Sequence, residues 1–87
     1  MTDAAPGLSE RDRAILDFEA AWSTHAGAKE EAIRADLGLA PARYYQLLGR
    51  LLDTAAAIEY DPMLVKRLRR LRAARERARA ARSAMAR

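Results

Sequence analysis

The chain has 87 residues, a formal net charge of +4, one histidine and no cysteine. A chain of this length forms one small domain with little room for a catalytic cleft, and without cysteine it has no disulfide framework or thiolate metal site. No apolar run approaches the roughly 18 residues that a membrane span requires, and the N-terminal segment lacks the features of a signal peptide. We therefore expect a cytoplasmic protein with no cofactor, no metal and no small-molecule substrate.

The charge is distributed unevenly along the chain. Residues 66–87 hold ten basic residues and one acidic residue, a net charge of +9, whereas residues 1–65 hold six basic and eleven acidic residues, a net charge of −5. An acidic body with a strongly basic end indicates a polyanionic partner. Hydrophobic residues make up 51% of the chain, but many are alanine, so the core is small and a homodimer would be one way to enlarge it.

The first predicted helix begins after a flexible segment, residues 1–8. Ser9 is a suitable N-cap, and Glu10 and Asp12 are favourable in a first turn. The helix should end within residues 24–27. Its inner face is formed by Ile15, Phe18 and Trp22, with Trp22 as a core anchor rather than a platform for base stacking.

The polar residues of this half of the chain show no catalytic constellation. His25 is the single histidine, so a metal site or a nucleophilic triad would lack its other members. We interpret the carboxylates as solvated, because they stand on helices beside basic residues. These carboxylates are Asp17, Glu19, Glu30 and Glu31.

Residues 28–52 have the outline of a helix-turn-helix. Residues 28–37 predict a second helix that turns Ile33 and Leu37 inward, and Gly38 ends it, since glycine adopts the left-handed conformation at no steric cost. Pro41 suits the first turn of a third helix, although Ala40 before it is a poor N-cap. Arg34 stands where a small residue is usual, so the two helices should cross differently from those of a repressor.

The third predicted helix, residues 41–52, has one apolar and one polar side. Tyr44, Leu47, Leu48, Leu51 and Leu52 share the inner side at helical spacing. Arginine can pair with guanine and glutamine with adenine in a major groove, which makes this a predicted recognition helix. The alternative is the solvated face of an ordinary helical bundle. The opposite side carries Ala42, Arg43, Gln46, Gly49 and Arg50, with Tyr45 at its edge.

The C-terminal part begins with a short connection over residues 55–60, which can include a helical turn. Its Ile58 and Tyr60 are expected to close the core. Asp61 and Pro62 then form an N-cap and N1 pair that opens a fourth helix. Its inner stripe consists of Leu64, Leu68 and Leu71, with Val65 beside them.

Beyond Leu71 the apolar stripe stops, because Arg75, Arg79 and Arg82 occupy the positions that would continue it. The segment is therefore not a coiled-coil seam. Its arginines point all round the helix, so their mutual repulsion should fray the free tail, and a polyanion would order it.

Several runs carry a family resemblance over residues 15–75: ILDFE at 15–19, GAKE at 27–30, AIR at 32–34, RYYQLL at 43–48, LLD at 51–53 and DPMLVKRLRRLR at 61–72. They resemble a family of small actinobacterial proteins catalogued as a domain of unknown function. At least one member is described as a nucleoid-associated, DNA-binding protein that responds to supercoiling. The resemblance implies DNA binding through Arg43, Tyr44, Tyr45 and Gln46 and through the basic run 66–72. The chain departs from the family pattern at Ala21, Ala40 and Gly49, and glycine within a helix costs about 1 kcal/mol.

Together these features predict an all-α, four-helix helix-turn-helix domain over residues 9–71, followed by an arginine-rich helical extension over residues 72–87. The expected partner is double-stranded DNA, bound by a nucleoid-associated or transcription-regulatory protein with helix 41–52 in the major groove and the tail on phosphates. A protein–protein adaptor of the transcription machinery and an RNA-binding protein are the alternatives. The predicted DNA-binding residues are Arg34, Arg43, Tyr45, Gln46, Arg50, Lys66, Arg67, Arg69, Arg70, Arg72, Arg75, Arg77, Arg79 and Arg82.

Overall fold

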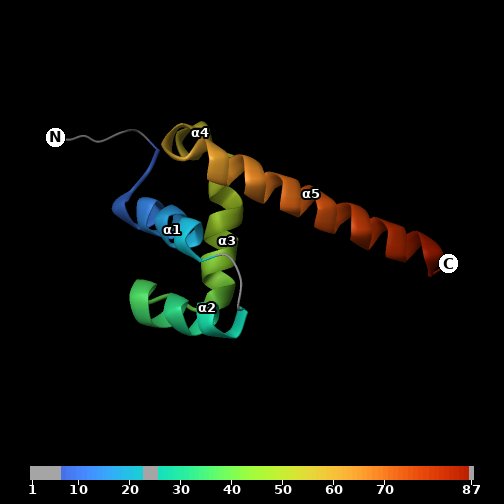
Figure 1. Cartoon of the computed structure of the whole chain (residues 1–87), viewed down its shortest axis with the longest axis horizontal. Coiled ribbons are helices and arrows are strands. Elements are labelled where there is room, and N and C mark those ends of the chain that lie inside the picture. Colours follow the sequence, from blue (N-terminus) through green and yellow to red (C-terminus); the bar gives the residue numbers. More distant parts are fainter. Residues whose placement is uncertain (1–6, 23–25, 87) are drawn as a thin grey trace.

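Helices make up almost all of the computed structural model, which describes residues 7–22 and 26–86 (Figure 1). No strand occurs in this part of the chain, so the predicted all-α class is confirmed, although five α-helices are present rather than four. The elements are α1 (Glu10–Ala21), α2 (Ala26–Ala32), the π-helix η1 (Ile33–Leu37), α3 (Pro41–Leu51), α4 (Ala55–Tyr60) and α5 (Pro62–Met85).

The start of α1 is fixed by a capping box, as the sequence predicted for Ser9. The Ser9 Oγ accepts a hydrogen bond from the Asp12 backbone N–H at 3.0 Å, and the Asp12 carboxylate accepts one from the Ser9 N–H at 3.1 Å. The helix ends at Ala21 with Trp22 as its C-cap, earlier than predicted. Residues 1–6 and His25 lie outside the described residues.

The predicted second helix is divided into two helix types. The α-helical turns of α2 continue directly into η1, in which hydrogen bonds span five residues instead of four. Gly38 then stops the helix with a φ of 66°, and its N–H donates to the Arg34 carbonyl oxygen at 3.1 Å. Pro41 opens α3 without a side-chain cap from Ala40, so the prediction for this junction is confirmed.

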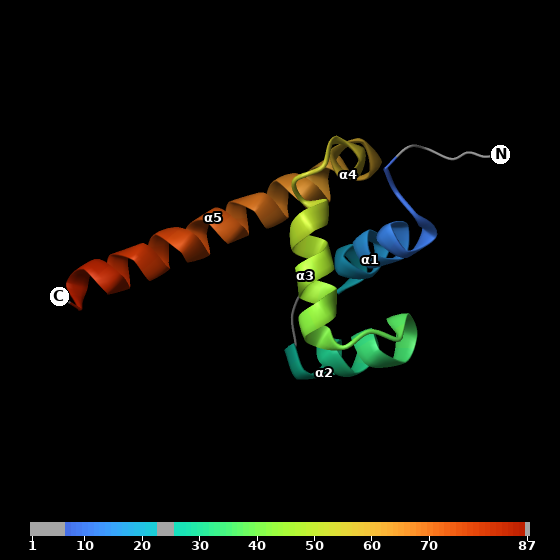
Figure 2. The same cartoon turned by 180° about the vertical axis from the view of Figure 1, so that it is seen from behind.

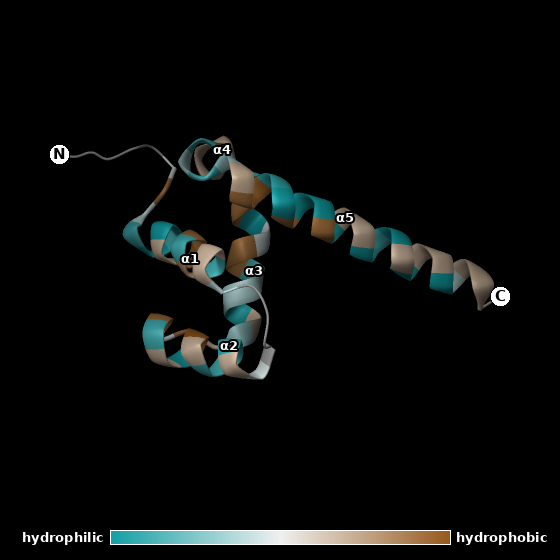
Figure 3. Cartoon of the chain, viewed as in Figure 1, coloured by the Kyte–Doolittle hydropathy of each residue, from teal (hydrophilic) through white to brown (hydrophobic). Residues whose placement is uncertain are grey.

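The core is organised around α3. Helices α1 and α2 lie along one side of α3, and the start of α5 lies at its C-terminal end (Figures 1 and 2). The predicted inner stripe of α3 is buried as expected. Fully burying one leucine contributes about 1.5–3 kcal/mol, so these side chains account for much of the driving force of folding. Hydrophobic colouring lies on α1, on the helix that α2 forms with η1, on α3 and on the first turns of α5 (Figure 3). The buried apolar residues include Ile15, Leu16 and Phe18 of α1, Ile33 of η1, Tyr44, Leu47, Leu48 and Leu51 of α3, Ala57 of α4, and Leu64 and Val65 of α5.

Residues 55–60, predicted as a short connection that can include a helical turn, form the short helix α4. The Thr54 Oγ1 caps it by accepting from the Ala57 N–H at 3.1 Å. The prediction that Ile58 and Tyr60 close the core is wrong, because both are exposed and the small Ala57 takes the inner position. The Tyr60 hydroxyl instead donates to Asp17 at 2.8 Å on the surface, which raises the pKa of Tyr60.

The last helix, α5, begins as predicted and then runs far beyond the core. The Asp61 carboxylate accepts from the Leu64 N–H at 3.2 Å, and Pro62 occupies the first turn. Leu64 is buried, but Leu71 is 45% exposed, so the inner stripe ends one turn earlier than predicted.

The arginine-rich segment is helical through Met85. Arginine and alanine are both good helix formers, so the segment can be helical without packing against the core. A helix of 24 residues is about 36 Å long, and its projection explains a molecule with extents of 56 × 28 × 19 Å. No helix in the described part of the chain is both long enough and apolar enough to cross a membrane.

Candidate nucleic-acid interface

The outer side of α3 presents the polar residues that the sequence singled out. Arg43, Gln46 and Arg50 are exposed, while the opposite side of the same helix is buried. The Arg43 Nη1 donates to the Gln46 Oε1 at 2.7 Å, so the two side chains are paired across one helical turn. Gln46 can pair bidentately with adenine only when both ends of its amide are free, and Arg43 would have to release it for that contact.

The two tyrosines of α3 do not belong to this polar side. Tyr44 is fully buried, so the DNA contact that the family resemblance implied for it is ruled out in this structure. Tyr45 is 41% exposed, but it lies about 100° round the helix from Gln46 and packs beside Tyr44, with ring centroids 5.0 Å apart. The Lys29 Nζ lies 5.5 Å from the centre of the Tyr45 ring.

A buried polar network fixes the position of α3. The Lys29 Nζ lies 2.8 Å from the Glu19 carboxylate, and the Tyr44 hydroxyl donates to the same carboxylate at 2.5 Å. Burial and this hydrogen bond raise the pKa of Tyr44, so the hydroxyl stays protonated. The interpretation of Glu19 as a solvated carboxylate is therefore wrong. Glu19 links α1, α2 and α3. Its position four residues after Ile15 already placed it on the inner face of α1.

Two arginines of α5 bind the C-terminal end of α3. The Arg69 Nε donates to the Leu52 carbonyl oxygen at 2.7 Å, and the Arg72 Nη2 pairs with the Asp53 Oδ1 at 2.8 Å. Arg72 also reaches the Gly49 carbonyl oxygen at 3.5 Å. The last carbonyl groups of a helix lack intrahelical partners and carry partial negative charge, so these contacts satisfy them. They also set the angle at which α5 leaves α3.

The ion pair between Arg72 and Asp53 perturbs the pKa values of both groups. The hydrogen bond from Arg72 lowers the pKa of Asp53, and the same bond raises the pKa of Arg72. The pair is partly exposed to solvent, so it orients the two helices more than it stabilises the fold.

The basic residues of α5 lie all round the helix, and four of the five arginines at positions 72–86 form a row along one side of it. With about 100° of rotation per residue, Arg72, Arg75, Arg79 and Arg82 lie within one narrow sector, on the side that continues from Leu68. Lys66, Arg70 and Arg77 share the opposite side. Arg67 and Arg69 lie on the flanks, and all these residues except Arg72 are well exposed.

The predicted binding residues thus form separate groups along α3. Arg34 is exposed on η1, which precedes the N-terminal end of α3 in the chain, whereas Arg69 and Arg72 contact the C-terminal end of α3. An 11-residue helix places these ends about 16 Å apart. Arg43, Gln46 and Arg50 lie between them on the outer side.

Comparison with known families identifies the chain at the family level. Residues 7–80 match DUF3263, a family of proteins of unknown function. The chain belongs to the DUF3263 family. Its matched region includes all of α3 and extends into α5 past Arg79, so the arginine row lies largely within it. Comparison with curated proteins and with solved structures found no match.

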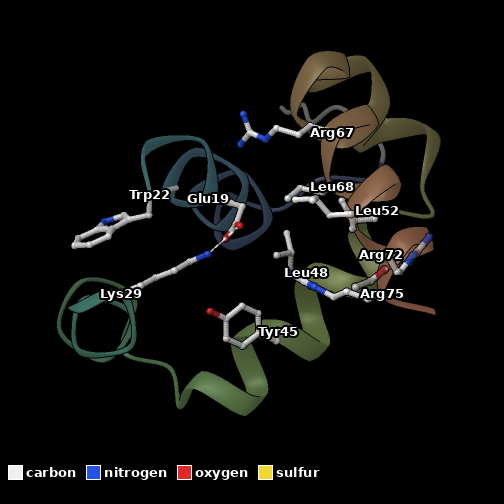
Figure 4. Close-up of a pocket in the computed structure, with 12 residues that line it drawn as sticks. Glu19, Trp22, Lys29, Tyr45, Leu48, Leu52, Arg67, Leu68, Arg72 and Arg75 are labelled. Atoms are coloured by element: carbon white, nitrogen blue, oxygen red, sulfur yellow. Dashed lines mark hydrogen bonds and ion pairs between the residues drawn. The ribbon is translucent and has the colours of Figure 1, made fainter. Parts of the chain in front are cut away.

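This DUF3263 protein also contains a groove that the sequence did not predict. The groove has a volume of about 620 Å³ and lies where side chains of α1, α2, α3 and α5 meet (Figure 4). Leu48, Leu52 and Leu68 line it, and Tyr45 and Trp22 stand at its side. No single helix reveals such a feature, because residues from four elements contribute to it. Within the described residues, no cluster of three or more potential metal ligands is present.

Proposed function

We propose that this protein binds double-stranded DNA as a nucleoid-associated or transcription-regulatory protein. In this proposal α2 with η1, the turn at Gly38 and α3 act as a helix-turn-helix, and α3 enters the major groove. The observation that carries the proposal is the exposed row of Arg43, Gln46 and Arg50 on a helix whose other side is locked into the core. Arginine and glutamine are the side chains that pair with guanine and adenine in that groove.

The basic helix α5 supplies the contacts to the phosphate backbone in this proposal. Its row from Arg72 to Arg82 extends over ten residues, about 15 Å along the helix, and three of its four arginines have no ion pair within the described residues. Arg69 and Arg72 hold the base of α5 against the C-terminal end of α3, so the basic helix is attached beside the proposed recognition helix. Phosphate contacts add affinity and register, while base contacts add sequence preference.

A pair of matched variants tests the role of α3. Arg43→Ala/Gln46→Ala and Arg11→Ala each remove one positive charge, but Arg11 is an exposed residue of α1 on another part of the surface. One lost bidentate pair costs about 1–3 kcal/mol, so the double variant should bind a duplex roughly 5- to 150-fold more weakly than the wild type. Arg11→Ala should bind within about twofold of the wild type, since it loses only a screened charge.

The measurement is fluorescence anisotropy of a labelled duplex, with unlabelled structured RNA as competitor. Equal affinities of the two variants would contradict a reading role for α3. Stronger competition by RNA than by duplex DNA would contradict the choice of partner.

A further inference from the structure

The groove between α3 and α5 combines an apolar floor with a basic rim. Leu48 of α3 and its C-cap residue Leu52 form the floor of the groove with Leu68 of α5. Leu71 lies at the edge of the groove and is 45% exposed. Trp22 lines the opposite side and stacks on Phe18, with ring centroids 5.9 Å apart. The groove has a volume of about 620 Å³, which lies in the range of sites that hold a ligand or a few side chains of a partner.

The rim carries positive charge that the groove itself does not neutralise. Glu19 is the one acidic residue among those that line it, and its carboxylate is already engaged by Lys29 and Tyr44. Arg67 and Arg75 also line it, and neither has an ion pair within residues 7–22 and 26–86.

The two rim arginines frame an exposed apolar residue. Residues four apart lie on the same face of a helix, so Arg67 and Arg75 stand one turn before and one turn after Leu71. Figure 4 shows Arg67 and Arg75 on two sides of the space in front of Leu48 and Leu68. An occupant with an apolar centre and negatively charged flanks would complement this arrangement.

We propose that this groove binds an acidic amphipathic helix of a partner protein. Apolar side chains of that helix would enter between Leu48, Leu68 and Leu71, and carboxylates on its flanks would pair with Arg67 and Arg75. This is the helix-in-groove mode, in which anchors at helical spacing fill a preformed apolar site. Duplex DNA would supply the negative charge but would leave the apolar floor unused, and this floor favours a protein partner.

The groove is separate from the face of α3 assigned to DNA. Tyr45 and Leu48 face the groove, whereas Gln46 and Arg50 lie about 100–160° away round the helix. The groove therefore leaves the outer side of α3 free, and the inference does not depend on DNA binding.

The test uses a synthetic peptide of about 15 residues with leucines at i, i+3, i+7 and i+10 and glutamates on both flanks. Trp22 is the single tryptophan of the chain and lines the groove, so its fluorescence reports occupancy directly. The full-length protein is titrated with this peptide and with a peptide of the same composition whose leucines are spread round the helix. We expect a saturable change in Trp22 fluorescence with the first peptide and at least tenfold weaker binding of the second.

Matched variants locate the binding. Leu71→Ser should weaken it at least fivefold, whereas Met85→Ser, which removes an exposed apolar side chain outside the groove, should leave it unchanged. Arg75→Gln should weaken it about threefold or more, whereas Arg77→Gln, with the same loss of charge on the other side of α5, should not. Circular dichroism of each variant checks that the fold is kept, which the exposure of these residues favours.

Three outcomes would overturn the proposal. The first is no change in Trp22 fluorescence at millimolar peptide. The second is equal binding of the two peptides, which would leave only charge attraction. The third is displacement of the peptide by a duplex or single-stranded oligonucleotide whose own binding is weakened by Leu71→Ser, which would assign the groove to nucleic acid.

Discussion

Replacement of Glu19 by leucine should cost this domain a large part of its stability. The carboxylate is 7% exposed and holds two partners, Lys29 at 2.8 Å and the Tyr44 hydroxyl at 2.5 Å. Lys29 is 9% exposed and Tyr44 is fully buried, so neither can replace the lost bond with water without moving. Removal of one partner of a buried ion pair costs about 3–5 kcal/mol. The total stability of a typical domain is about 5–15 kcal/mol, so the variant should be close to unfolding.

The double variant Glu19→Leu/Lys29→Met separates the ion pair from simple packing. An apolar pair of similar volume leaves no buried charge, so we expect the double variant to regain most of the lost stability. Its free energy of unfolding should approach that of Tyr44→Phe, a variant that loses one hydrogen bond and about 1 kcal/mol of stability. If the double variant is as unstable as Glu19→Leu, the loss comes from disturbed packing and this reasoning is wrong.

Urea unfolding followed by Trp22 fluorescence is the suitable assay. Trp22 stacks on Phe18, and Phe18 packs edge-on against Tyr44 with ring centroids 5.6 Å apart, so the signal reports the region around Glu19. Far-ultraviolet circular dichroism would be dominated by α5, whose outer part lies outside the core. If a variant shifts the urea concentration at the midpoint and leaves the dependence of the unfolding free energy on urea unchanged, the shift converts directly into a change in the free energy of unfolding.

Three further predictions concern α3 and its two ends. Gly49→Ala should raise the free energy of unfolding by about 0.5–1 kcal/mol in urea, because no atom lies within 4 Å of the added Cβ and alanine is the better helix former. Gly38→Ala should lower it by about 1–2 kcal/mol in the same assay, since φ is 66° there. The lowered pKa of Asp53 means that the contribution of its ion pair with Arg72 is present above the ordinary value of 3.8 and is lost as the pH falls through the lowered pKa. The stability difference between wild type and Asp53→Asn should therefore vanish in acid, and a difference that persists below both pKa values would contradict this linkage.

The sequence predicted those parts of the fold that depend on local chemistry. The caps at Ser9 and Asp61, the stop at Gly38 and the start at Pro41 each follow from the hydrogen-bonding or φ preference of one residue type. The buried stripe of α3 follows from helical periodicity over eleven residues.

The sequence did not predict features that depend on how helices meet. Glu19 was assigned to the surface because it stands on a helix beside basic residues, although its position four residues after Ile15 placed it on the inner face. Leu71 was assigned to the core because it continues a stripe, but it is 45% exposed and lines the groove. The bonds from Arg69 and Arg72 to α3 depend on a crossing that periodicity does not specify. The groove depends on all of these packing relations together.

The most direct test of the proposed function is the salt dependence of duplex binding by the full-length protein and by a variant with Arg75, Arg77, Arg79 and Arg82 changed to glutamine. These four arginines have no ion pair within the described residues, and the contacts of Arg69 and Arg72 to α3 are kept. Each neutralised phosphate contributes about −0.9 to the slope of log K against log salt, and three of the four arginines belong to the row, so the wild-type slope should be steeper by roughly 3. The same four positions changed to lysine should keep the wild-type slope. Equal slopes for the wild type and the glutamine variant, or no duplex binding by the wild type at low salt, would contradict the account.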